Sequence, residues 1–168
     1  MRKTLQVLND LERAGFFRRY AIGGAVAAIF YMEAVPTEDL DILVLINEPP
    51  AHPLMPLDPL NHELIRRGYT KDGPYDLIEG MPVQFIVAPT PLVAEAIEVA
   101  REQDLDGVLT RVPAAEYLAA IMIETKRPKD RVRFSQFVEQ AGLDQVKLTE
   151  IMERYNLLET YNQWTLSS

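Results

Sequence analysis

Apolar residues recur along the chain at two spacings, and each spacing predicts one kind of element. Leu5, Leu8 and Leu11 lie three residues apart, as on one face of an amphipathic helix, and Gly15 follows where such a helix would end. Leu40 to Ile46 is rich in Leu, Ile and Val, which is typical of a strand buried on both faces. The same patterns predict helices over residues 3–14, 25–31 and 57–67, a further helix that opens at Pro91, and strands over 20–22, 40–46, 75–78, 83–88 and 107–112.

From Pro113 onward the apolar spacing is helical, and no repeat or low-complexity tract interrupts it. The 168 residues have the length of one domain. We therefore predict an α+β protein, in which a small sheet covered by helices is followed by a C-terminal helical segment. The core is expected over residues 1–112, and the helical segment, packed on that core, over 113–168.

Two carboxylates open the most apolar of the predicted strands. Residues 37–44 read Thr-Glu-Asp-Leu-Asp-Ile-Leu-Val, and strand alternation places Asp39 and Asp41 together on one face. Like charges held close together repel each other, so the pair needs a cation or solvent to persist. Mg²⁺ suits it, because this ion prefers oxygen ligands and is often shared between carboxylates and substrate phosphates. The alternative is structural: Asp39 caps the exposed entrance of the strand, and Asp41 is solvated.

Gly23 and Gly24 lie between a predicted strand and a predicted helix. Glycine has no side chain, so backbone N–H groups and a helix N-terminus can approach a phosphate there. Together with the acid pair of the next unit, the glycines supply both halves of a nucleotide site: donors for a triphosphate and carboxylates for its metal. We therefore predict that the glycines and the two acids converge on one pocket.

The composition narrows the chemistry open to such a site. The 25 acidic residues outnumber the 17 basic ones, and the net charge of −8 argues against broad DNA binding and against anionic membranes. No cysteine is present, which excludes thiol nucleophiles and thiolate metal sites. His52 and His62 lack the spacing of a zinc site. Neither a membrane-spanning run nor a signal-peptide pattern is found, so we predict a cytoplasmic protein.

The order of these motifs resembles a known family. Residues 21–27, Ala-Ile-Gly-Gly-Ala-Val-Ala, and then the Thr-Glu-Asp-Leu-Asp strand are similar to the opening of the minimal nucleotidyltransferase, or polymerase-beta-like, superfamily. The similarity is greatest to small bacterial proteins related to the toxin of type IV (abortive-infection) toxin–antitoxin systems, in which a Lys/Arg-Lys-Asp helix start follows. Here that element is residues 124–131, Glu-Thr-Lys-Arg-Pro-Lys-Asp-Arg, and the resemblance spans residues 18–138. It implies the small mixed β-sheet of the nucleotidyltransferase fold.

The resemblance also implies an activity and roles for individual residues. Such proteins transfer a nucleoside monophosphate from a nucleoside triphosphate to an acceptor hydroxyl, here an RNA end or a protein side chain, and release pyrophosphate. A cognate antitoxin or toxin protein is the implied protein partner. The implied site residues are Gly23, Gly24 and Thr37 for the nucleotide phosphates, Asp39 and Asp41 for catalysis and for one or two Mg²⁺ ions, and Lys126 and Lys129 for phosphate charge.

The basic segment around these lysines is notable without the resemblance. Between residues 126 and 133 five cations stand against a single acid, Asp130, in a chain whose net charge is −8. Such a cluster suits a polyanionic triphosphate. The alternative is a solvated helix start in which Asp130 is a favourable first-turn acid.

The chain departs from the family pattern at the third carboxylate. In active relatives a later strand presents an acid that completes the metal site and serves as general base, and the matching strand here carries Gln84. An amide oxygen can bind a metal, but an amide cannot take up a proton. Asp76 or Glu79 on the preceding strand are alternatives for that role. A catalytically degenerate nucleotide-binding or antitoxin-like interaction protein is therefore the alternative function.

Overall fold

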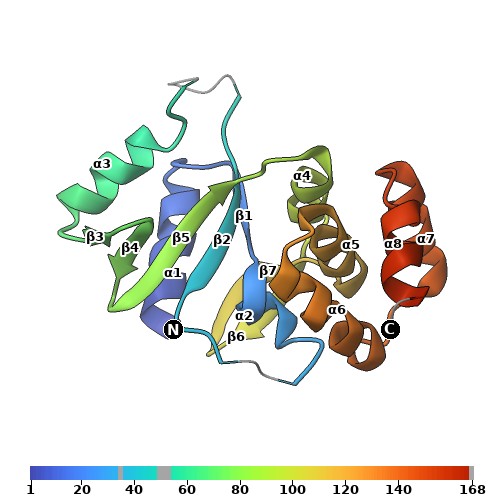
Figure 1. Ribbon diagram of the computed structural model, residues 1–168. Coiled ribbons are helices and arrows are strands. Elements are labelled where there is room, and N and C mark those ends of the chain that lie inside the picture. The colour runs from blue at the N-terminus through green and yellow to red at the C-terminus, as the bar shows by residue number, and fades with distance from the viewer. Residues whose placement is uncertain (34–35, 49–53, 167–168) are drawn as a thin grey trace.

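The computed structural model describes residues 1–33, 36–48 and 54–166, and all but two of their side chains, those of Lys129 and Leu166 (Figure 1). His52 lies outside the described residues. The elements in chain order are α1 (Arg2–Arg13), β1 (Arg19–Ile22), α2 (Gly24–Ala28), β2 (Leu40–Leu45), α3 (Asp58–Arg66), β3 (Thr70–Asp72), β4 (Tyr75–Ile78), β5 (Met81–Val87), α4 (Pro91–Glu98), β6 (Arg101–Leu105), β7 (Val108–Val112), α5 (Ala115–Thr125), α6 (Pro128–Gln140), α7 (Gln145–Arg154) and α8 (Leu158–Leu166).

Five strands form one mixed sheet in the order β1-β2-β5-β4-β3. β2 and β5 are parallel neighbours, and the other pairs are antiparallel. In the β2–β5 register Asp41 is the partner of Gln84, so these two side chains share one face of the sheet. The predicted α+β class, with a small mixed sheet followed by C-terminal helices, is confirmed.

The central strand β2 is buried on both faces, as its aliphatic run predicts. Leu40, Ile42 and Val44 belong to the main core, together with the three leucines of the α1 stripe. Leu43 and Leu45 on the opposite face form a smaller cluster with α4. Asp39 and Asp41 continue this second face toward the start of the strand, where the apolar cluster ends.

Two strands were not predicted. β3 is exposed at all three residues, and β6 is mostly charged and exposed, so neither has the apolar alternation that predicts a strand. Backbone pairing with an apolar neighbour forms each of them. β7 lies where the last strand was predicted, but it pairs with β6 in a separate two-stranded sheet. The helix predicted over residues 25–31 is shorter, Gly24–Ala28.

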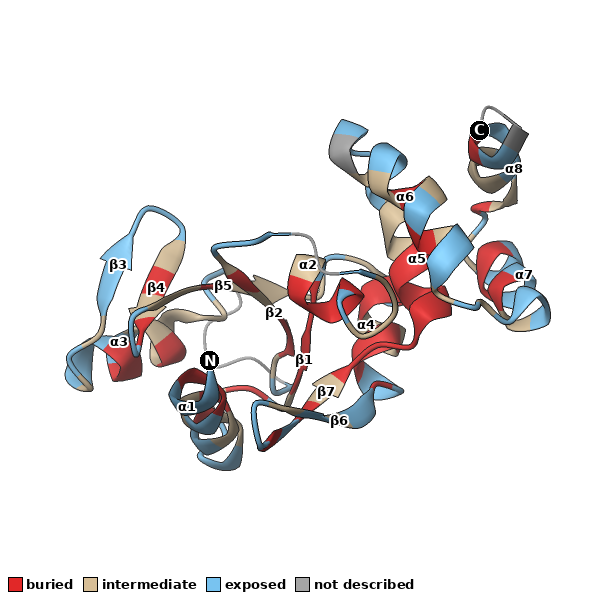
Figure 2. Cartoon of the chain, turned by 90° about the horizontal axis from the view of Figure 1, so that it is seen from below, coloured by how far each residue is buried: buried red, intermediate tan, exposed pale blue. Residues whose placement is uncertain are grey.

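The C-terminal helices pack on the sheet-containing part of the chain through α5. Seven of its eleven residues are buried, which is typical of a helix enclosed on all sides. It contacts α2 and α4 on one side and α6 and α7 on the other, and Figure 2 shows its buried surface between these groups. The predicted division of the chain after residue 112 stays a prediction, and it coincides with the gap between β7 and α5. Within the described residues, every helix is too short or too polar to cross a membrane.

Glu95 of α4 ties the C-terminal helices to the sheet. Its carboxylate accepts hydrogen bonds from the hydroxyl of Tyr117 on α5 at 2.9 Å, from the hydroxyl of Tyr155, and from the guanidinium of Arg154 on α7. Burial alone raises the pKa of Glu95, but these donors outweigh burial and leave the pKa below its usual 4.5. Burial and the contact with Glu95 together raise the pKa of both tyrosines to about 12.

We expect Glu95→Gln to lower the free energy of unfolding by about 2 kcal/mol at neutral pH, because hydrogen bonds to an ionised group are lost. The folded carboxyl has the lower pKa, so its stabilisation is present above pH 4.5 and is lost as the pH falls through the folded value. Denaturant unfolding should show the two proteins converging in acid. Glu98→Gln is the control, because the exposed ion pair of Glu98 with Arg18 is worth less than about 1 kcal/mol. A difference in the free energy of unfolding between Glu95→Gln and the wild type that does not change with pH would contradict this role of Glu95.

Candidate functional site

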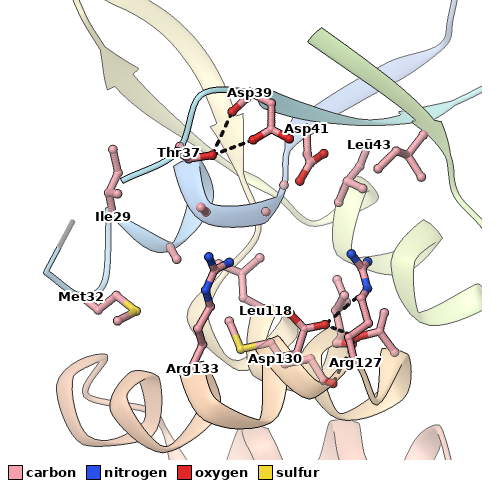
Figure 3. A pocket seen from close by; sticks show the side chains of 18 of the residues that line it. Ile29, Met32, Thr37, Asp39, Asp41, Leu43, Leu118, Arg127, Asp130 and Arg133 are labelled. Carbon is pink, nitrogen blue, oxygen red and sulfur yellow. Dashed lines mark hydrogen bonds and ion pairs between the residues drawn. The ribbon is translucent and has the colours of Figure 1, made fainter. Parts of the chain in front are cut away.

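A cavity of about 170 Å³ opens between the sheet and the C-terminal helices (Figure 3). The start of β2 and the glycine turn before α2 form one wall, and α5 with the first part of α6 forms the other. The residues that line it are Gly23, Gly24, Ala25, Ala28, Ile29, Met32, Glu33, Thr37, Asp39, Asp41, Leu43, Ile86, Leu118, Ile121, Met122, Thr125, Arg127, Asp130 and Arg133.

The glycine turn and the acid pair meet in this cavity, as predicted. The backbone N–H of Gly23 donates to the carbonyl of Asp41 at 2.8 Å and so extends the β1–β2 pairing by one bond. Gly24 has a φ of +56°, and a Cβ there would lie 2.1 Å from Oδ2 of Asp41. A side chain at Gly24 would therefore occupy the place of the carboxylate. A Cβ at Gly23 would come within 3.0 Å of Leu43, so both glycines permit close approach to β2.

Asp41, on β2, and Asp39, directly before β2, both line the cavity (Figure 3). The hydroxyl of Thr37 donates to Oδ1 of Asp39 at 2.7 Å, and the hydroxyl of Tyr75 donates to Oδ2 at 3.4 Å. Thr37 itself lines the cavity. Thr37 contacts Asp39 and so orients that carboxylate. The predicted role of Thr37 in phosphate binding stays a prediction.

The two carboxylates fit a divalent cation that completes its shell with water and substrate. Both line one cavity, and their oxygens are the ligands that Mg²⁺ prefers. Gln84, the third predicted ligand, is the strand partner of Asp41 but does not line the cavity, so its role as a ligand stays a prediction. No cluster of three His, Asp or Glu side chains is suited to a metal anywhere in the described part of the chain. The donor set therefore fits an ion shared with substrate phosphates better than an ion held by protein groups alone.

The two alternative third acids have other partners. Asp76 is in register with Val83, and Val83 with Leu40, so strand alternation puts Asp76 on the face opposite Asp41. There it is buried and paired with Lys71. Glu79 lies in the β4–β5 turn and accepts a hydrogen bond from Tyr69. Gln84 is thus the group placed beside Asp41.

The opposite wall of the cavity carries positive charge. Figure 3 shows Arg127 and Arg133 extending from the α6 segment toward the carboxylates. Asp130 lies between them, and its carboxylate accepts from the Thr125 hydroxyl at 2.8 Å and pairs with Arg127 at 3.4 Å. Arg127 is paired with Asp130, whereas Arg133, which also lines the cavity, forms no ion pair with another described side chain.

The predicted lysines are placed differently. Lys126 is the C-cap of α5 with a φ of +53°, is exposed, and does not line the cavity. Lys129 belongs to α6, but its side chain lies outside the described part of the chain. The sequence singled out these lysines by resemblance, whereas helical spacing could have identified the arginines: residues 127, 130 and 133 recur every three positions on one face.

Between the two charged walls the cavity is apolar. Its apolar side chains come from α2 and the segment after it, from α5, and from the strands β2 and β5: Ala25, Ala28, Ile29, Met32, Leu118, Ile121, Met122, Leu43 and Ile86. Such a surface accepts a planar, weakly polar group such as a nucleobase, and methionine adapts readily to its shape. The site therefore offers carboxylates, cations and an apolar wall within one cavity.

The chain superposes on the crystal structure of an antigenic nucleotidyltransferase-like protein from Paracoccidioides brasiliensis with a TM-score of 0.53 and 13% sequence identity, over 97% of this chain and 90% of that one. This chain has a nucleotidyltransferase-like fold. Two structures of ANT(2'')-Ia also match: a complex with adenylyl-2''-tobramycin (14% identity, TM-score 0.47, 90% of this chain, 96% of that one) and a solution structure (15%, 0.46, 95% and 96%). No protein-family model and no curated protein matches the sequence.

In this nucleotidyltransferase-like fold, we expect Gly24→Ala to displace Asp41, because the new Cβ would lie 2.1 Å from its carboxylate oxygen. The left-handed backbone adds about 1–2 kcal/mol of strain. Gly142→Ala is the matched control: its φ of +59° carries the same strain, but a Cβ there meets nothing within 4 Å. Denaturant unfolding should show that both variants are destabilised by the shared backbone strain. Titration with Mn²⁺ should show a loss of affinity only in Gly24→Ala. Unchanged affinity in Gly24→Ala would contradict the close approach.

Proposed function

We propose that this protein transfers a nucleoside monophosphate from a nucleoside triphosphate to an acceptor hydroxyl, with Mg²⁺, and releases pyrophosphate. The observation that carries the proposal is the approach of Gly24 to the Asp41 carboxylate inside a cavity whose other wall holds Arg127 and Arg133. A carboxylate pair facing cations across an apolar gap is complementary to a metal–triphosphate with its base. The nucleotidyltransferase-like fold supports the same reaction class.

Each group has a role in this proposal. Asp39 and Asp41 would hold Mg²⁺, which when bound neutralises phosphate charge and stabilises the leaving oxygens. Gly23 and Gly24 admit a phosphate to the backbone, and Arg133 and Arg127 supply positive charge. The α2 helix has a single turn, so its dipole contributes little and the arginines matter more. In the transfer, the acceptor oxygen forms a bond to the α-phosphorus while the bond to pyrophosphate breaks.

The acceptor class and the partner belong to the same proposal. An RNA end or a protein side chain supplies the hydroxyl, and a cognate antitoxin or toxin protein is the partner that the sequence resemblance implies. We propose a cytoplasmic site of action, because nucleoside triphosphates are available there.

We expect isothermal titration to show Mg²⁺-dependent binding of a nucleoside triphosphate that Asp41→Asn reduces by at least about tenfold, because the metal loses a charged ligand. Labelled triphosphate added with Mg²⁺ and cell extract should release pyrophosphate and mark an acceptor. Asp72→Asn, at the exposed outer edge of the sheet, is the control and should bind as the wild type does. Wild-type labelling by Asp41→Asn would contradict the metal assignment.

The position of Gln84 favours a second candidate, a degenerate nucleotide-binding or antitoxin-like interaction protein. Gln84 is the strand partner of Asp41, and its amide cannot take the proton of an acceptor hydroxyl. In this case the cavity keeps affinity for metal–nucleotide while turnover is slow or absent.

We expect Gln84→Glu to distinguish the two candidates, since it installs a proton acceptor beside Asp41 at nearly constant volume. If the wild-type protein lacks a general base, pyrophosphate release should rise by at least about tenfold in the variant, because general-base catalysis is worth about 10²–10⁴-fold. Gln103→Glu on β6, outside the cavity, controls for added charge. A wild type that turns over, with no gain in Gln84→Glu, supports the enzyme; binding without turnover, followed by gain in Gln84→Glu, supports the degenerate protein.

A further inference from the structure

Tyr75 reaches the carboxylate pair from the far side of Gln84. It is the first residue of β4, and its hydroxyl donates to Oδ2 of Asp39 at 3.4 Å. The β4–β5 register pairs Asp76 with Val83, and continuing it by one residue places Tyr75 opposite Gln84. Gln84 is in turn the partner of Asp41. Tyr75, Gln84 and Asp41, from three adjacent strands, therefore lie in one row on one face of the sheet, and Asp41 lines the cavity.

A short hairpin fixes the backbone position of Tyr75. Tyr75 pairs with Asp72 across a two-residue turn, Gly73-Pro74. Gly73 has a φ of +57°, which tight hairpin turns require, and the ring of Pro74 fixes the next φ. The ring of Tyr75 thus starts from a backbone position with little freedom.

The hydroxyl of Tyr75 acts as a donor to Asp39. An ionised carboxylate only accepts hydrogen bonds, so the phenol hydroxyl is the donor in this contact. Thr37 donates to the other oxygen of the same carboxylate at 2.7 Å. Each carboxylate oxygen has two lone-pair sites, so Asp39 can accept both hydrogen bonds and still bind a cation.

We infer that Tyr75 is a positioning residue of the divalent-cation site, whose hydroxyl fixes the orientation of the Asp39 carboxylate beside Asp41. The inference rests on the proposed function, because it takes Asp39 as a metal ligand. Hydrogen bonds to ligating carboxylates set their direction, and loss of such a bond costs about 10–100-fold in metal affinity. With a neutral amide in place of a third acid, the orientation of the two remaining carboxylates accounts for more of that affinity.

The test is titration of the full chain with Mn²⁺, without nucleotide, followed by the electron paramagnetic resonance signal of free Mn²⁺. We expect Tyr75→Phe, which keeps the ring and removes the hydroxyl, to weaken Mn²⁺ binding by about tenfold, the lower end of the range because the contact is long. The unfolding temperature should stay that of the wild type. Tyr69→Phe is the matched control: its hydroxyl bonds Glu79 at 3.0 Å on the same hairpin, away from the carboxylate pair, and its removal should leave Mn²⁺ affinity unchanged.

The outcomes separate the inference from the proposed function. Wild-type Mn²⁺ affinity in Tyr75→Phe overturns the positioning role and leaves the proposed site intact. Equal losses in Tyr75→Phe and Tyr69→Phe assign the effect to the hairpin as a whole and also overturn it. The variants are compared in the condition in which the wild type binds Mn²⁺. A wild-type chain that binds Mn²⁺ neither alone nor with a nonhydrolysable nucleoside triphosphate contradicts the proposed function, and the inference fails with it.

Discussion

The site depends on the close approach of one backbone segment to one carboxylate. Asp41 leans against Gly24 so closely that any Cβ there would occupy the space of its oxygen. Two conditions make this approach possible: the Gly23 N–H continues the pairing of β1 with β2, and Gly24 adopts a positive φ. The approach brings backbone and acid together at the point where a metal–triphosphate would meet both.

Charge is distributed across the cavity in a way that the net charge of −8 does not reveal. The acids come from the start of β2, where the apolar run of the strand ends, and the arginines come from the N-cap and the first part of α6. Asp130 bonds Thr125 and Arg127 across the α5–α6 joint and so ties one cation to the helix start. Asp130 is a first-turn acid of α6, as the structural alternative predicts, and Arg133 lines the cavity. The role of the basic segment in binding phosphate stays a prediction.

The C-terminal helices are part of the site because α5 is enclosed between α4 and α7. The cost of burying Glu95 among these helices is offset by three donors, and its lowered pKa reflects that balance. This network holds α5 and, through the joint at Lys126, the cationic start of α6. The helices thus close the cavity that the sheet alone leaves open.

The sequence by itself determined the local features: the helix of α1, the β2 strand, the glycine turn and the placement of Asp39 and Asp41 on one face. Each of these follows from backbone conformation and alternation within a few residues. Only the tertiary structure decided that Arg127 and Arg133 line the cavity, that Tyr75 touches Asp39, and that Asp76 faces away. Tyr75 and Asp39 are 36 positions apart, and the two arginines lie further still from the acids in sequence. No local pattern encodes a strand register or a helix docking angle. β3 and β6 formed for the same reason, since pairing partners, rather than their own polar residues, made them strands.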